Sequence, residues 1–225
     1  GLERALKDGG AIGRVIICGL RHLSPDVSME LARLAVAYKQ RGVVAFDLAR
    51  GELGNPATPH AAAFSYAREH DLACTCHAGE GADASYVREA VHVCGAHRIG
   101  HATRLIEDES LTQYVNDRRI ALEICLTSNV QTHAVESYEE HPLRRYYDRG
   151  MNVVLNTDNR LMSGTTLTDE YAWAAKALGF TFDELAEIAL NSFASAFLPW
   201  QEREALVTRA RDEIGALRNN VGRRS

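Results

Sequence analysis

The stretch Ala73-Cys74-Thr75-Cys76-His77-Ala78-Gly79-Glu80 places a short apolar run directly before a histidine, two small residues and a glutamate. The run is too short for a helix, so it predicts a buried strand with His77 at its C-terminal end. The small residues at 78 and 79 allow a sharp turn that brings Glu80 back toward the same end. This order of a short apolar run and then a polar group recurs along the chain.

Five more runs of this kind predict strands. With the first run, the predicted strands lie at residues 14–18, 43–46, 73–76, 98–100, 120–126 and 152–155. Amphipathic stretches between and after them predict helices at residues 28–40, 84–94, 143–149, 168–178 and 182–193. Ser24-Pro25-Asp26 is typical of a helix start. Strands that alternate with helices indicate an α/β fold, either a doubly wound open sheet or a (β/α)8 barrel.

The residues at the strand ends favour the barrel. Successive predicted strands lead into Asp47, His77, His101, Asn129 and Asp158. In a (β/α)8 barrel the C-terminal strand ends converge on one mouth, where the active site lies. No glycine-rich phosphate-binding motif follows any strand, which weakens the open-sheet interpretation. Six strands do not close a barrel of eight, so we expect residues 1–225 to form a single domain that is an incomplete (β/α)8 TIM barrel, comprising strands 3–8.

The chemistry of these residues suits metal-assisted hydrolysis. Histidine and aspartate can bind one Zn²⁺ with a position left for water, while glutamate and histidine can move protons. Each residue also has a plainer explanation when taken alone. A lone histidine is often a hydrogen-bonded core residue, Asp158 could cap the helix that follows it, and Asp47 could hold a loop.

Four motifs resemble the ordered signature of the adenosine deaminase family, and the resemblance covers nearly the whole chain. They are Cys76-His77-Ala78-Gly79-Glu80, Arg98-Ile99-Gly100-His101, Thr127-Ser128-Asn129 and Leu155-Asn156-Thr157-Asp158. The resemblance implies one Zn²⁺ bound by His77 and Asp158, with Asp47 supporting the site or the structure. It further implies that Glu80 protonates purine N1, and that His101 orients the attacking water and helps to deprotonate it.

The sequence departs from the family pattern at several positions. Asn159 stands where a second aspartate facing purine N7 is usual, and an amide can donate a hydrogen bond there. Arg160 replaces a common proline, and Ala102 replaces a common glycine. Arg50 stands where the family has a glycine close to purine N3, so we expect Gly51 to take that contact with the substrate.

The implied reaction is hydrolytic deamination of adenosine and 2'-deoxyadenosine, which releases ammonia. One alternative is a deaminase of a modified adenine nucleoside such as aminodeoxyfutalosine. Another is a catalytically inactive barrel remnant that binds a partner or has no role. The family's first strand carries a His-x-His pair of zinc ligands, and no His-x-His occurs in this sequence. We therefore expect an N-terminal segment to be missing and the 225 residues alone to be inactive.

Composition excludes several other classes. The net charge of −5 argues against a nucleic-acid-binding surface, and no apolar run reaches the ~20 residues that cross a bilayer. The five cysteines are odd in number and form no CxxC pair, which favours reduced thiols in a cytoplasmic protein. The expected partner is a small purine nucleoside, with neither nucleic acid nor a membrane.

Overall fold

The computed structural model describes residues 2–8 and 12–221 and divides the chain into two compact units, Gly1–His97 and Arg98–Ser225. Each unit is described by itself. Residues 1, 9–11 and 222–225, which the predicted single domain includes, lie outside the described part of the chain. The single domain stays a prediction.

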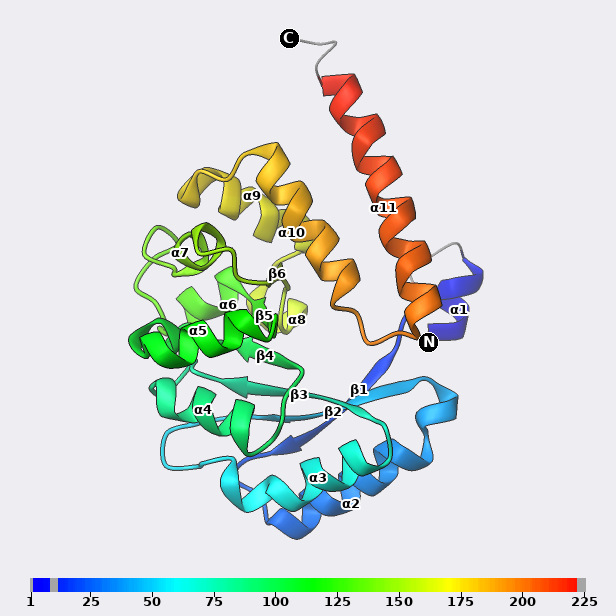
Figure 1. Cartoon of the computed structure of the whole chain (residues 1–225), viewed down its shortest axis with the longest axis vertical. Helices are drawn as coiled ribbons and strands as arrows, with labels where there is room; N and C mark the ends of the chain where they lie inside the picture. Colours follow the sequence, from blue (N-terminus) through cyan, green and yellow to red (C-terminus); the bar gives the residue numbers. More distant parts are fainter. Residues whose placement is uncertain (1, 9–11, 222–225) are drawn as a thin grey trace. The chain divides into compact units, whose positions relative to one another are not determined.

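The first unit is a parallel sheet with helices (Figure 1). Its strands follow the order of the chain: β1 (Val15–Leu20), β2 (Val43–Ala49) and β3 (Ala73–Ala78). Its helices are α1 (Leu2–Lys7), α2 (Pro25–Ala37), α3 (Ala61–Glu69) and α4 (Ala84–His92), with short 3-10 turns at Lys39–Arg41 and Thr58–His60. Helices α2 and α3 lie side by side, and both contact β2 (Figure 1).

Local sequence explains the packing of α2. Ser24 caps the helix by accepting a hydrogen bond from the Asp26 N–H at 3.1 Å, and Pro25 occupies the first helical position. The small residues Ala32 and Ala35 are fully buried, so the helix can approach the sheet closely. The helix start predicted from Ser24-Pro25-Asp26 is confirmed.

The second unit is also built on a parallel sheet. Its strands are β4 (Arg98–His101), β5 (Ala121–Ile124) and β6 (Val153–Leu155), again in chain order. Its helices are α5 (Glu109–Asp117), α6 (Leu126–Gln131), α7 (Leu143–Asp148), α8 (Arg160–Ser163), α9 (Leu167–Leu178), α10 (Phe182–Ala194) and α11 (Trp200–Val221), with a 3-10 turn at Leu105–Glu107. Helix α10 packs on β6 and on α11.

Polar and aromatic contacts join the outer helices of this unit. Gly179 has a φ of 68° and ends α9, and Thr181 then begins α10 by a capping box with Glu184. Arg144 of α7 lies over the Phe180 ring at 4.5 Å from its centroid and pairs with Glu184 at 2.7 Å. This cluster fixes α7, which carries residues of the candidate site.

The α/β prediction is confirmed, and all six predicted runs contain strands. In each unit the strands follow the chain order, as in a barrel, whereas a doubly wound sheet reverses its order at a switch point. Four strands continue beyond their predicted ends: β1 to Leu20, β2 to Ala49, β3 to Ala78 and β4 to His101. The run at 120–126 was predicted too long, because Leu126 begins α6.

All five cysteines are free thiols, and four of them are buried. Burial raises the pKa of Cys74 to about 12, which keeps this thiol neutral and unreactive. Within residues 2–8 and 12–221, no helix combines the length and the apolar character needed to cross a membrane.

Candidate active site

In the first unit, His77 is oriented by a carboxylate on the neighbouring strand. Its Nδ1 lies 3.1 Å from Asp47 Oδ1 and 3.0 Å from Oδ2. Burial alone raises the pKa of Asp47, but the charge and hydrogen bond of His77, with bonds from Leu48 and Cys18, outweigh it and lower the pKa below its ordinary value. Asp47 is therefore ionised. A carboxylate on one imidazole nitrogen is the arrangement that fixes metal-binding histidines in proteins.

The turn after β3 is held by Glu52, which sequence reasoning missed. The Glu52 side chain is buried, and its carboxylate accepts hydrogen bonds from three backbone N–H groups: those of Gly79 at 3.1 Å, Glu80 at 3.2 Å and Ala82 at 3.0 Å. Burial raises the pKa of Glu52, while these donors and the charge of Arg21 oppose that rise. Glu80 itself is half-buried, and its backbone position is set by this carboxylate.

Arg21 supports the same turn from the other side. It is buried, and its guanidinium donates to the His77 carbonyl at 2.6 Å and to the Asn55 carbonyl at 3.0 Å. The sequence offered weak signals for Glu52 and Arg21: each lies just beyond a strand, but neither belongs to a motif that points to chemistry. Together they fix the backbone between His77 and Glu80.

The backbone explains why a glycine suits position 50. Arg50 has a φ of 83°, a left-handed conformation that glycine adopts without a steric penalty. The Arg50 side chain is exposed. At Gly51 an added Cβ would meet nothing within 4 Å, and the Gly51 carbonyl accepts from Asn55 Nδ2 at 3.0 Å. The contact of Gly51 with a substrate stays a prediction.

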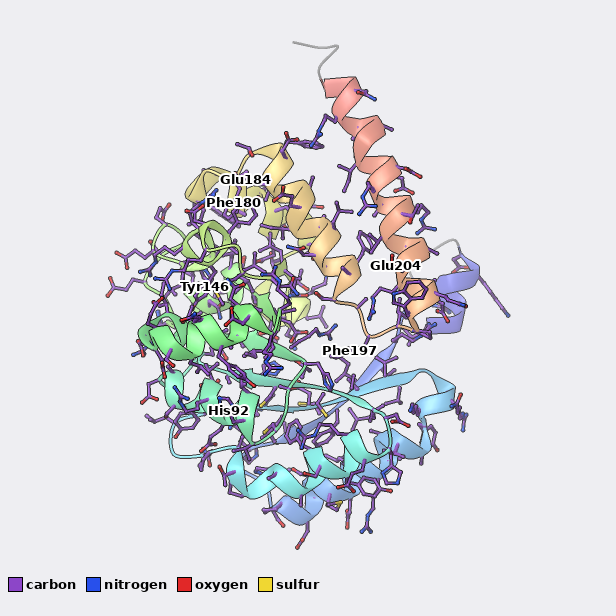
Figure 2. The ribbon with its side chains drawn as sticks, viewed as in Figure 1. His92, Tyr146, Phe180, Glu184, Phe197 and Glu204 are labelled. Atoms are coloured by element: carbon purple, nitrogen blue, oxygen red, sulfur yellow. The ribbon has the colours of Figure 1, made fainter. Side chains whose placement is uncertain are left out.

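In the second unit, His101 ends β4 in a strained turn. His101 and Ala102 are both buried, with φ values of 63° and 53°. Such conformations in residues other than glycine cost about 1–3 kcal/mol each and cluster at functional sites. Tyr146, which α7 places in the interior (Figure 2), donates its hydroxyl to the Ala102 carbonyl at 2.8 Å and accepts from the Ile106 N–H at 3.0 Å. The tyrosine therefore pins the turn that follows His101.

The His101 ring belongs to a buried row of polar side chains. Its Nδ1 lies 2.9 Å from Asn129 Nδ2, and Asn129 Oδ1 lies 3.1 Å from His141 Nε2. The Leu143 N–H donates to His141 Nδ1 at 3.0 Å. Nothing in the linear order of the sequence connects His141 to Asn129.

Asp158 and Asn159 have different roles, because only one of the two side chains caps helix α8. Asn159, and not Asp158, caps α8, since its Oδ1 accepts from the Met162 N–H at 3.2 Å. The Asp158 carboxylate instead accepts from Ser128 Oγ at 2.8 Å. Asp158 is exposed and has a φ of 51°. The capping explanation for Asp158 is therefore wrong.

A second buried glutamate holds the start of α6. Glu170 of α9 is fully buried, and it accepts from the Thr127 N–H at 3.1 Å and from Thr165 Oγ1 at 2.9 Å. It sets the position of the segment that carries Ser128 and Asn129, as Glu52 does for Glu80. No motif predicts this contact, which joins two residues 43 positions apart in the chain.

The donor atoms fit zinc in kind. His77 is held at Nδ1 by Asp47, and Asp158 is a carboxylate with one oxygen held by Ser128. Zinc sites take three or four protein ligands. Among the residues that the structure describes, no three His, Cys, Asp or Glu side chains form a group that could hold a metal ion. The roles of His77 and Asp158 as zinc ligands stay predictions.

Comparison with known proteins shows the family. The adenosine deaminase family profile matches residues 1–213. The chain belongs to the adenosine deaminase family. It is 42% identical over 185 residues to a probable adenosine deaminase of Dictyostelium discoideum and 38% identical over 209 residues to an adenosine deaminase of Mycobacterium avium. These matches cover 82% and 86% of the chain but only 24% and 57% of the two relatives.

Solved structures show the same fold. An adenine deaminase from Arthrobacter aurescens matches with a TM-score of 0.88 and 29% identity, over 95% of this chain and 65% of that one. An amidohydrolase from Burkholderia ambifaria, solved with bound zinc, matches with a TM-score of 0.91 over 98% of this chain and 62% of that one; at 21% identity it shows the fold alone. The predicted (β/α)8 barrel, of which this chain forms an incomplete part, is confirmed.

Proposed function

We propose that the protein hydrolyses the 6-amino group from an adenine nucleoside, with adenosine as the principal substrate. The observation that carries this proposal is the family match, which spans residues 1–213 and so includes every predicted site residue. The oriented His77 and the Ser128-held Asp158 support it, because a hydrolase of this kind needs donor groups fixed in place before substrate arrives. Water supplies the oxygen that replaces nitrogen at C6, and ammonia leaves.

Each predicted residue has a task in this reaction. Glu80 delivers a proton to purine N1 while the attacking oxygen bonds to C6. His101 positions that oxygen, and Asp158 accepts a hydrogen bond from it. Asn159 offers its amide Nδ2 to purine N7, because Oδ1 is occupied by the α8 cap. Gly51 offers its N–H toward purine N3.

Zinc, when bound, supplies a Lewis acid that lowers the pKa of water to near neutrality. His77 and Asp158 would hold it, with Asp47 keeping the imidazole in orientation. The whole protein should contain about one zinc per chain by elemental analysis. A strong chelator should abolish turnover, and added Zn²⁺ should restore it. His77→Ala should lower the zinc content of the purified protein, a result that does not depend on any assay of activity.

The conversion of adenosine to inosine is followed by the loss of adenosine absorbance. Glu80→Gln should lower kcat by at least about 10²-fold and leave the zinc content unchanged, since Glu80 handles protons and binds no metal. Glu139→Gln, a matched change at an exposed glutamate, should leave kcat as it is. Full activity in Glu80→Gln would refute the role of Glu80. Absence of turnover in the whole wild-type protein would favour an inactive binding protein.

A second candidate substrate follows from the 29% identity to a structure described as an adenine deaminase. The free base and modified adenine nucleosides such as aminodeoxyfutalosine share the purine N1 and N7 atoms that Glu80 and Asn159 would recognise. A panel of adenosine, 2'-deoxyadenosine, adenine and aminodeoxyfutalosine, compared by kcat/KM, separates these substrates. We expect adenosine to give the highest value.

A further inference from the structure

A continuous row of buried hydrogen bonds connects the His101 ring to the backbone at the start of α7. Its members in order are His101, Asn129, His141 and the Leu143 N–H, with separations of 2.9, 3.1 and 3.0 Å. The three side chains are each at most 2% exposed. Buried polar atoms that lose a hydrogen-bond partner destabilise the folded state, so every bond in the row needs one donor and one acceptor.

The direction of the row is set by its last member. A backbone N–H can only donate, so His141 Nδ1 must accept from Leu143 and cannot carry a proton. The proton of a neutral His141 therefore lies on Nε2, and it is donated to Asn129 Oδ1. The amide nitrogen of Asn129 then faces His101 Nδ1 as a donor. Consequently His101 Nδ1 accepts.

The charge state of His141 preserves this direction at neutral pH. Burial above all, with the charge of Arg145, lowers the pKa of His141 to about 3. A proton added at Nδ1 would face the Leu143 N–H, donor against donor. The fixed end of the row is thus a neutral imidazole.

We propose that Asn129 and His141 are positioning residues that hold His101 as the tautomer protonated at Nε2. In the reaction proposed above, on which this second step rests, His101 then offers a hydrogen-bond donor to the attacking oxygen, and the proton of the attacking water passes to Asp158, whose carboxylate accepts its hydrogen bond. This role differs from the expectation from sequence, in which His101 helps to deprotonate water. The histidine stabilises negative charge as it develops on the oxygen.

The tautomer is measured directly in the whole wild-type protein labelled with ¹⁵N-histidine. At pH 8, two-bond ¹H–¹⁵N correlation spectra should show both His101 and His141 protonated at Nε2, with His101→Gln and His141→Gln assigning the signals. A His101 ring protonated at Nδ1 would overturn the proposal. This measurement needs no turnover. The predicted tautomer in a protein without deaminase activity would leave the row intact and refute only the proposed function.

Matched substitutions test the consequence for catalysis. His141→Leu breaks the row and should lower kcat about 10–100-fold with little change in KM, as outer partners of site residues commonly do. His141→Gln keeps a hydrogen-bond acceptor and a donor in its amide group, so its kcat should lie much closer to the wild-type value than that of His141→Leu. Asn129→Asp faces His101 with an acceptor and should move its proton to Nδ1 in the spectrum while kcat falls. Equal activity in His141→Leu and His141→Gln would count against the row.

Discussion

The buried His141 makes a specific contribution to the pH dependence of stability. Its pKa is about 3 in the folded chain, and the ordinary value of 6.5 applies in the unfolded chain. A group with a lowered folded pKa favours the folded state fully above pH 6.5, and that contribution is lost as the pH falls toward 3. The reason is that His141 takes up a proton in the unfolded chain, whereas the buried ring of the folded chain stays neutral.

The magnitude follows from the gap between the two pKa values. The whole gap corresponds to about 5 kcal/mol, and the part lost between pH 7 and pH 5 is about 2 kcal/mol. His141→Gln removes the titrating group and keeps a donor and an acceptor for Asn129 and Leu143. Between pH 7 and pH 5, the free energy of unfolding of the wild-type protein should therefore fall by about 2 kcal/mol more than that of the variant.

Urea unfolding of both proteins at pH 7 and pH 5, followed by circular dichroism, measures this difference. All other titrating groups are shared, so their contributions cancel in the comparison. A stability difference between the two proteins that is equal at both pH values would show that His141 titrates normally. Such a result would also remove the support that its neutral state gives to the hydrogen-bonded row.

Three other substitutions test how the site is held. Glu52→Gln turns an amide NH₂ toward one of the three N–H donors, so we expect the free energy of unfolding in urea to fall by about 2–3 kcal/mol. Turnover should also fall, because Glu80 moves. Unchanged stability would contradict the hydrogen bonds described. Tyr146→Phe leaves the turn after β4 without its hydroxyl partner and should cost about 1–3 kcal/mol by the same assay, whereas a neutral effect would mean that water replaces the hydroxyl. Arg50→Gly relieves a φ of 83°, so it should raise the melting temperature and add about 1 kcal/mol to the free energy of unfolding. The control Arg118→Gly, at a φ of −88°, should lower the melting temperature. Equal effects of the two changes would show that the backbone at Arg50 is unstrained.

The strands could be located from sequence because each is a short apolar run between amphipathic stretches. Their ends were less certain, since Asp47 and His77 are polar and yet continue β2 and β3. Burial of Asp47 is possible only because His77 and neighbouring donors satisfy its carboxylate. Helix α3 was missed although Phe64 and Ala67 have helical spacing, because its alanine-rich sequence lacks a strong polar face.

The site could be predicted only where motifs carry it. The four motifs locate the candidate chemical groups, because those groups must follow strands at fixed positions. The residues that hold them come from distant parts of the chain, as Glu170 does for Thr127, and no spacing rule connects such pairs. The departure at Arg50 became intelligible only from its backbone angle, which a sequence does not display.

The residues predicted to act in catalysis lie on backbone that other residues hold in place, and this support bears on the reaction. His101 and Asp158 both adopt left-handed backbone, at about 1–3 kcal/mol each, and such backbone persists only where surrounding contacts over-determine it. Tyr146 supplies those contacts after β4, while Glu52 and Glu170 hold the two segments that follow β3 and β5. A rigid support of this kind matters most when charge develops during the reaction, because donors already in place need no rearrangement. Loss of a supporting residue should therefore reduce kcat more than it raises KM.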